Sequence, residues 1–356
     1  MRKVCCWLLL FAWTLYAYPQ SKSYLFLWSG DDGKKSTDFL GVIDADAKSP
    51  RYGQVVASVA VPGPTGTPHH TELEMPEGGF LLANAFDSGR TVLFDVSDPL
   101  HPAVVTSFGD LDGYMHPHTY VRLANGHILA TFQYRGGQDA KSDGGGLVEF
   151  DDHGHVIRSS SAMDPAAKEE LIRPYSLVAV PALDRVVSTN TAMHRDEADT
   201  RTVQIWRLSD LKLLHTMVLP AGLRGSEKNP GEPKVLADGK TVLVHTFSCG
   251  LYQMEGIESD HPSARSLKTF DGKICAVPLR INHFWVQSLF SEHAIASYDI
   301  SDLSSLREVS RGYFGRQAEA TLDFSGCRCP TDHLELRRIR RAPSLHAELR
   351  SENGSV

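Results

Sequence analysis

Short runs of apolar residues alternate with turn sequences along most of the chain, and the pattern repeats. One recurring unit is a turn followed by aliphatic residues, found at residues 75–83, 123–130, 181–188, 236–244 and, in a weaker form, 279–286. Asn-Gly at 125–126 and Asp-Gly at 238–239 supply the positive φ angles of a tight hairpin, and β-branched or aliphatic residues follow them. The unit therefore predicts a turn and a β-strand at each place.

A second recurring unit is a strand that ends in Asp, a short turn and another strand. It occurs at residues 93–106, 203–216 and 296–310, with shorter copies at 41–46 and 147–152. Together the two units recur with a period of roughly 45 to 58 residues, and repeats of that length with four short strands are typical of a β-propeller. We count six copies and part of a seventh at residues 322–326. The pattern predicts an all-β propeller with seven blades, the last incomplete or altered.

The predicted propeller spans residues 18–315. One segment within it, residues 164–172, is predicted to be helical, because Asp164 can cap a helix and Pro165 can open it. After residue 315 the chain becomes rich in arginine and loses strand alternation. Residues 316–356 are therefore predicted to be an atypical tail that either closes the ring in an unusual way or is truncated or altered; we favour the second interpretation.

The first 17 residues have the features of a signal peptide. Arg2 and Lys3 precede an apolar run over residues 4–13, and Ala17 offers a small residue for cleavage. The alternatives are a buried N-terminal strand and an uncleaved anchor. No other stretch approaches the roughly 18 apolar residues that a membrane-spanning helix needs. We therefore expect a periplasmic or secreted protein whose mature chain has no membrane span.

Composition and charge narrow the range of partners. Of the 356 residues, 42% are apolar and 22% are charged, which is typical of a globular protein. The formal net charge is −7, so the chain offers no general electrostatic attraction for nucleic acid. The basic run at residues 337–341 is interpreted as a solvated surface patch.

Four of the six cysteines follow the predicted signal peptide. Cys249 and Cys275 both lie near predicted strand edges and are close in sequence, so we expect a disulfide between them in an oxidising compartment. Two buried free thiols are the alternative, because a free cysteine packs like a small apolar side chain.

The placement of the 16 histidines suggests a metal site. The motifs at residues 68–70 and 116–118 each precede a turn-and-strand unit, so they occupy equivalent places in consecutive repeats. In a propeller, the segment that enters the innermost strand lies at the mouth of the central channel. Neutral imidazole is the commonest protein ligand for zinc, copper and similar ions. The predicted metal ligands are His69, His70, His118 and His116.

Other residues could support such a site. Glu72 follows the first motif and could fix the tautomer of a ligand. Tyr175, His194 and His283 are further channel candidates, although a single histidine is more often an ordinary core or surface side chain. The glycine run at residues 144–146 is interpreted as a loop before a strand and not as a phosphate-binding loop.

Four segments of the sequence resemble the selenium-binding protein family, which includes bacterial methanethiol oxidases. They are residues 38–56, 69–70, 118–126 and 298–302, and the resemblance extends from about residue 24 to 315. It implies a seven-bladed propeller that binds copper through channel histidines and oxidises methanethiol with O₂ to formaldehyde, hydrogen sulfide and hydrogen peroxide. Carried over residue by residue, His69, His70 and His118 would be the copper ligands, with His116 as an extra one.

The sequence departs from this family in two places. The last blade of the family carries a further histidine-bearing segment that is not recognisable here, and a missing ligand would weaken metal binding or abolish turnover. The family's reactive N-terminal cysteine has no match outside the predicted signal peptide, which weakens the case for selenium binding. Two hypotheses follow: an exported copper oxidase that acts on a small thiol with O₂, or a non-catalytic propeller that binds a metal or a partner.

Overall fold

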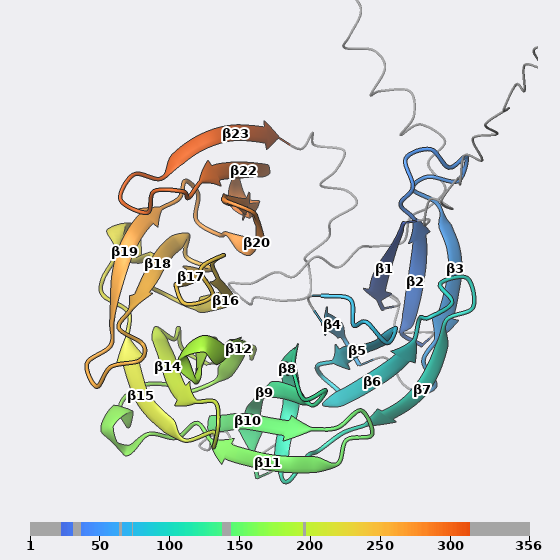
Figure 1. Ribbon diagram of the computed structural model, residues 1–356, viewed down its shortest axis with the longest axis horizontal. Helices are drawn as coiled ribbons and strands as arrows, with labels where there is room; N and C mark the ends of the chain where they lie inside the picture. The colour runs from blue at the N-terminus through green and yellow to red at the C-terminus, as the bar shows by residue number, and fades with distance from the viewer. Residues whose placement is uncertain are drawn as a thin grey trace, which may run out of the picture.

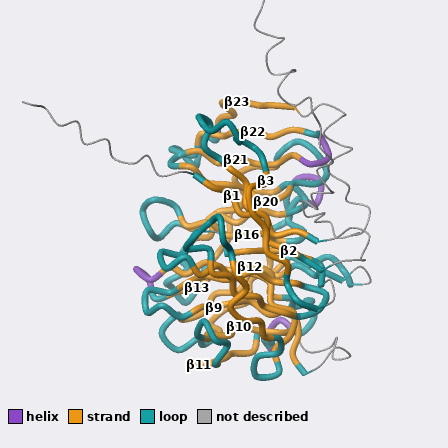
Figure 2. Tube along the Cα trace, turned by 90° about the vertical axis from the view of Figure 1, so that its right-hand side faces the viewer, coloured by secondary structure: helices purple, strands orange, loops and turns teal. Residues whose placement is uncertain are grey.

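The repeated turn-and-strand units form antiparallel sheets in which order along the chain is also order in space. The computed structural model describes residues 23–30, 37–63, 66–72, 74–136, 144–194 and 197–313. These residues form six sheets arranged around a common axis, which makes the fold an all-β propeller (Figure 1). Figure 2 shows the ring from the side, with the strands in the middle and loops on either side.

The first sheet has three strands and each of the other five has four. The first three sheets contain β1 (Tyr24–Ser29), β2 (Phe39–Asp44) and β3 (Val55–Ala60); β4 (Pro68–Thr71), β5 (Phe80–Ala85), β6 (Arg90–Asp95) and β7 (Ala103–Phe108); and β8 (Tyr114–Arg122), β9 (Ile128–Arg135), β10 (Gly144–Phe150) and β11 (Val156–Ser161). The last three contain β12 (Pro174–Val180), β13 (Arg185–Asn190), β14 (Thr202–Arg207) and β15 (Leu213–Val218); β16 (Pro230–Val235), β17 (Val242–Thr246), β18 (Gly250–Glu255) and β19 (Ser263–Thr269); and β20 (Ala276–Ile281), β21 (Phe284–Leu289), β22 (Ala294–Asp299) and β23 (Arg307–Tyr313).

The described residues form six blades, which corrects the predicted number of seven. One face of the last sheet packs on the fifth through Trp285, Ala296 and Tyr298. The opposite face carries Leu279 and Ile295, which are 61% and 38% exposed, and Figure 1 shows no described sheet between this one and the first. The partial seventh repeat at residues 322–326, on which the larger number depended, lies outside the described residues, as do the predicted signal peptide and the tail from residue 316.

The predicted helix over residues 164–172 is reduced to one 3₁₀ turn, η1 (Pro165–Ala167). Asp164 caps it as expected, because its side chain accepts a hydrogen bond of 2.9 Å from the Ala166 amide. After this turn the chain passes through the buried residues Ile172 and Arg173 and enters β12 at Pro174. The other 3₁₀ turns are η2 (Pro181–Leu183), η3 (Leu223–Gly225) and η4 (Phe290–Glu292). In the part of the chain described, no helix combines the length and apolar character needed to cross a membrane.

A β-bulge recurs in the strand nearest the axis of every four-stranded sheet. Opposite β5, for example, Pro68 pairs with Ala85 and Thr71 pairs with Ala83, so β4 advances three residues while β5 advances two. An extra residue of this kind redirects the side chains beside it. The corresponding bulges lie at residues 68–71, 117–120, 174–177, 230–233 and 276–279.

Candidate metal centre

Two of these bulges bring His69, His70 and His118 together. Consecutive side chains of a regular strand point to opposite faces, but the bulge in β4 allows both His69 and His70 to contact His118 of β8. The three residues offer ring nitrogens that lie within 4.8 Å of one another. The closest pair is His69 Nε2 and His118 Nε2, which are 2.8 Å apart.

The burial and the protonation state of this cluster are compatible with metal binding. His118 is fully buried and His70 is 9% exposed. Burial lowers the pKa of His70 and Lys234 lowers it further, while Glu232 opposes them in part, so the imidazole is neutral at pH 7. A neutral imidazole has a free lone pair for a metal. Three such nitrogen donors fit copper, zinc and similar ions, and they do not fit magnesium or calcium, which prefer oxygen ligands.

Asn84 of β5 fixes the backbone of both histidine strands. Its side-chain oxygen accepts a hydrogen bond from the His70 amide, and its Nδ2 donates to Pro117 O at 2.7 Å and to His118 O at 3.2 Å. One fully buried side chain therefore sets the separation of the two strands that carry the cluster. Our sequence analysis did not identify Asn84, because an asparagine inside an apolar strand carries no metal-binding signal.

Tyr175 lies beside the cluster and packs against His118. It comes from the bulge of β12, its ring centroid is 3.8 Å from that of His118, and it is fully buried. Its ring also faces His70 at 6.2 Å. The channel position predicted for Tyr175 thus brings it into contact with one of the three histidines.

Glu232 reaches the cluster from the other side of the channel. It lies in the bulge of β16, and its Oε1 is 3.7 Å from His70 Nδ1 although the two residues belong to sheets that are not neighbours. Lys234 Nζ donates to Glu232 Oε2 at 2.6 Å. Burial raises the pKa of Glu232, but Lys234 and His70 outweigh this effect, so the pKa lies below its usual value. The sequence analysis did not identify Glu232, although its spacing from Pro230 matches that of His70 from Pro68.

His116 does not join the cluster. Its backbone is left-handed, with φ of 56°, and its Nδ1 lies 2.8 Å from Phe86 O. Its ring packs against Tyr134 and the predicted channel residue His194, with centroids 5.4 and 5.9 Å away. The ring of Phe86 contacts both groups, at 5.3 Å from His116 and 5.7 Å from His69. His116 and His194 therefore form a separate pair beyond Phe86.

The contacts of Glu72 and His283 are with residues other than the three histidines. Glu72 accepts a hydrogen bond of 2.9 Å from the Leu82 amide and forms an ion pair of 3.2 Å with Arg122, so its carboxylate already has partners. His283 is exposed in the turn between β20 and β21 and stacks on Phe284 at 4.0 Å. Neither residue supports the cluster as the sequence analysis expected.

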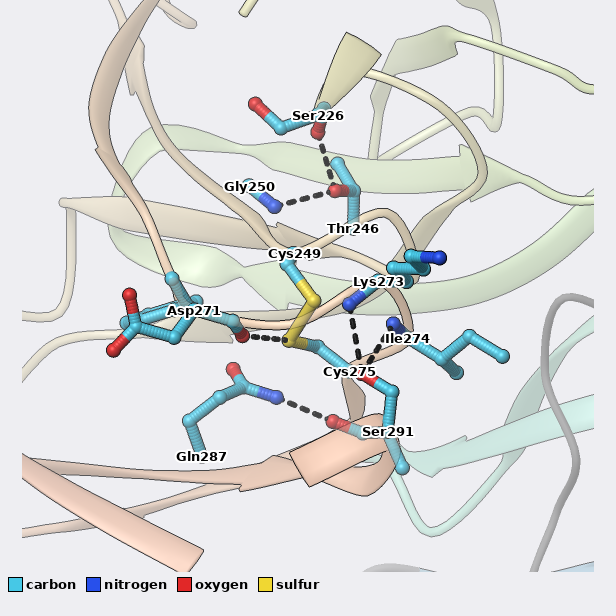
Figure 3. The surroundings of a disulfide bond; sticks show 12 residues. Ser226, Thr246, Cys249, Gly250, Asp271, Lys273, Ile274, Cys275, Gln287 and Ser291 are labelled. Carbon is cyan, nitrogen blue, oxygen red and sulfur yellow. Dashed lines mark hydrogen bonds between the residues drawn. A yellow bond between two sulfur atoms is a disulfide. The ribbon is translucent and has the colours of Figure 1, made fainter. Parts of the chain in front are cut away.

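The structure joins Cys249 to Cys275 in a disulfide (Figure 3). Both cysteines are fully buried. Cys249 lies in the turn between β17 and β18, and Cys275 immediately precedes β20, so the bond ties the fifth sheet to the innermost strand of the sixth. Hydrogen bonds flank it on both sides, from Gly250 N to Thr246 Oγ1 at 2.8 Å and from Lys273 N to Ser291 Oγ at 2.7 Å.

Comparison with known proteins relates the chain to one enzyme over part of its length. Methanethiol oxidase from a Hyphomicrobium species is 28% identical over 145 residues, which are 38% of this chain and 31% of that protein. The match therefore spans about a third of the length of that relative. No family model matches the chain.

Solved structures support the fold. A hypothetical selenium-binding protein from Sulfolobus tokodaii superposes with a TM-score of 0.66 at 15% identity, covering 82% of this chain and 73% of that one. The β-propeller domain of Cps50 (Swd1) from Myceliophteria thermophila gives a TM-score of 0.54 at 10% identity, covering 82% and 83%. At such identities the likeness is one of fold alone. The chain is thus a β-propeller that is similar to methanethiol oxidase over part of its length and shares its fold with a hypothetical selenium-binding protein.

Proposed function

We propose that this protein binds copper through His69, His70 and His118 and oxidises a small thiol, such as methanethiol, with O₂. The observation that carries the proposal is the convergence of three histidines from two neighbouring blades on one point of the channel. The partial relation to methanethiol oxidase supports the choice of reaction.

The donor set favours copper among the ions that imidazole binds. Divalent copper binds nitrogen ligands more strongly than the other common first-row divalent ions do. Bound copper would supply a site for the thiolate sulfur and a one-electron redox couple. The overall reaction consumes methanethiol, O₂ and water and yields formaldehyde, hydrogen sulfide and hydrogen peroxide, which balances in atoms and electrons.

The residues around the histidines suit a small apolar substrate. Phe86 packs against His69 at 5.7 Å and against His118 at 6.0 Å, and it is 3% exposed. Tyr175 packs against the ring of His118, with centroids 3.8 Å apart. These rings would limit water around the reacting sulfur and offer apolar contact to a methyl group.

Export to the periplasm or the cell exterior is part of the proposal. It is supported by the charged and apolar pattern of residues 1–17 and by the Cys249–Cys275 disulfide. Disulfides persist in oxidising compartments and are rare in the cytosol.

The test combines metal analysis with an assay of turnover. The purified protein is loaded with Cu(II), its copper content is measured, and thiol-dependent peroxide formation is followed. We expect one copper per chain and peroxide in the unaltered protein, and loss of both in His118→Ala with unchanged circular dichroism. The control is His261→Ala, which alters an exposed histidine in the turn between β18 and β19. Full activity in His118→Ala would overturn the proposal, and stoichiometric copper without peroxide would favour metal storage.

A further inference from the structure

We propose that Glu232 is a positioning residue of the metal centre: its carboxylate receives the Nδ1–H of His70, so that Nε2 of the same ring is the atom presented to the ion. The inference rests on the proposed function for the presence of an ion. It concerns a residue of the fifth blade, which our sequence analysis did not connect with the site.

The propeller repeat places Glu232 opposite His70. Each of the two residues follows the first proline of its bulge by two positions, in the segments 68–71 and 230–233. Two blades separate their sheets, so their approach to 3.7 Å crosses the channel. The repeat therefore supplies the carboxylate from the same bulge position that supplies the histidine.

The carboxylate has one oxygen free for this role. Oε2 accepts the hydrogen bond from Lys234, whereas Oε1 has no hydrogen-bond partner among the described residues. The nitrogen that Oε1 approaches is His70 Nδ1. A separation of 3.7 Å is longer than a hydrogen bond, and a movement of roughly 0.8 Å would form one. Metal-binding histidines commonly donate their second N–H to a carboxylate, which fixes the tautomer and the ring orientation.

The backbone of the fifth blade holds Glu232 in this place. A Cβ atom on Gly231 would lie 2.2 Å from His245 Cε1, so the ring of His245 fills the space that a side chain at 231 would need. His245 Nδ1 also lies 3.3 Å from Glu232 O. Residue 231 corresponds to His69 in the β4 bulge. Because residue 231 is a glycine and has no side chain, Glu232 provides the side chain that extends from this part of the bulge into the channel.

A purely structural role makes different predictions. If Glu232 serves merely as the partner of Lys234, its removal should lower stability and leave the coordination of the ion unchanged. If Glu232 orients His70, its removal should change both the affinity for copper and the electronic structure of the bound ion, even where stability is preserved.

The experiment compares Glu232→Gln with the double variant Glu232→Gln/Lys234→Met, which avoids leaving the lysine unpaired. The control is Glu149→Gln, which removes a carboxylate that is 2% exposed and pairs with Arg158 and His127 on the third sheet. Cu(II) affinity is measured by competition titration, the Cu(II) electron paramagnetic resonance spectrum is recorded, and the melting temperature of the metal-free protein is determined. We expect both Glu232 variants to bind Cu(II) about 10- to 100-fold more weakly, with altered hyperfine splitting, while the control keeps the unaltered affinity and spectrum.

Each result of this experiment either supports or overturns the role of Glu232. Unaltered affinity and spectrum in both Glu232 variants, with a change in melting temperature alone, would overturn the inference and leave the proposed function standing. Absence of Cu(II) binding by the unaltered protein would overturn the proposed function and this inference together. That result is read before any variant is made, so the two failures are distinguishable.

Discussion

His69 Nε2 and His118 Nε2 lie 2.8 Å apart although the two residues belong to different sheets. Two imidazoles approach this closely when one ring donates its Nε2–H to the lone pair of the other, and in a neutral pair the two rings are then different tautomers. An ion held by both nitrogens would use both lone pairs. Binding must therefore move one hydrogen to Nδ1. On His118 that atom lies 3.1 Å from Thr119 Oγ1, which can accept it.

The first prediction concerns which histidines hold the ion. Alanine at His69, His70 or His118 should each weaken Cu(II) binding by more than the 10- to 100-fold that follows loss of a supporting group. His116→Ala should retain stoichiometric binding, because its Nδ1 is occupied by Phe86 O and its ring lies with Tyr134. Competition titration of the four variants measures the difference.

Equal loss of copper in His116→Ala and His118→Ala would contradict this grouping. It would restore the set of four ligands that the sequence suggested. Circular dichroism of each metal-free variant provides the control, since a misfolded variant would lose copper for an unrelated reason.

The repeats and turns predicted the strands well, since tight turns and alternating apolar residues are local signals. In each innermost strand, the β-bulge changes the direction of the two side chains that follow its first residue. This effect cannot be predicted from the local sequence. His118 follows Pro117 and joins the cluster, whereas His116 precedes it and turns away with a left-handed backbone. Glu232 follows Pro230 in the same register, but its partner His70 is far away along the chain. Contacts across the channel depend on the arrangement of the blades around a common axis, which short motifs do not encode.

The second prediction concerns the disulfide. It closes a loop with a sequence separation of 26 residues, and chain entropy assigns such a bond about 3.5 kcal/mol of stability. Cys249→Ala/Cys275→Ala should therefore lower the free energy of unfolding by about 2–4 kcal/mol in urea titrations. Reductant should destabilise the unaltered protein and have no effect on the double variant. Equal sensitivity of both proteins to reductant would show that the bond does not form in solution.

The third prediction concerns Gly231. Alanine there would place its Cβ 2.2 Å from His245 Cε1, so either the ring or the bulge must move. We expect Gly231→Ala to lower the free energy of unfolding by about 1–3 kcal/mol, as overpacking of a dense core does. Gly41→Ala is the matched control in β2, because the nearest atom to its Cβ would lie at 3.7 Å, an ordinary contact. Similar unfolding free energies for the two variants would contradict the predicted crowding at 231.

The fourth prediction concerns the response of metal-free stability to acid. Burial lowers the pKa of His245 from 6.5 to about 4. Between these values the unfolded chain binds a proton that the folded protein does not, so the free energy of unfolding falls as the pH falls from 6.5 to 4. The contribution of His245 is fully present above pH 6.5, and its loss amounts to about 3 kcal/mol. Burial lowers the pKa of His70 and His116 too, so they contribute with the same sign.

His245→Asn isolates this contribution. The asparagine amide can still donate to Glu232 O, but it does not titrate. Its absolute stability at pH 8 will differ from that of the unaltered protein, so the informative quantity is the slope of the unfolding free energy between pH 7 and pH 5. We expect a shallower slope in His245→Asn and an unchanged slope in the exposed control His261→Asn. Identical slopes in all three metal-free proteins would mean that His245 is protonated in the folded state within this range, which its complete burial beside Phe247 argues against.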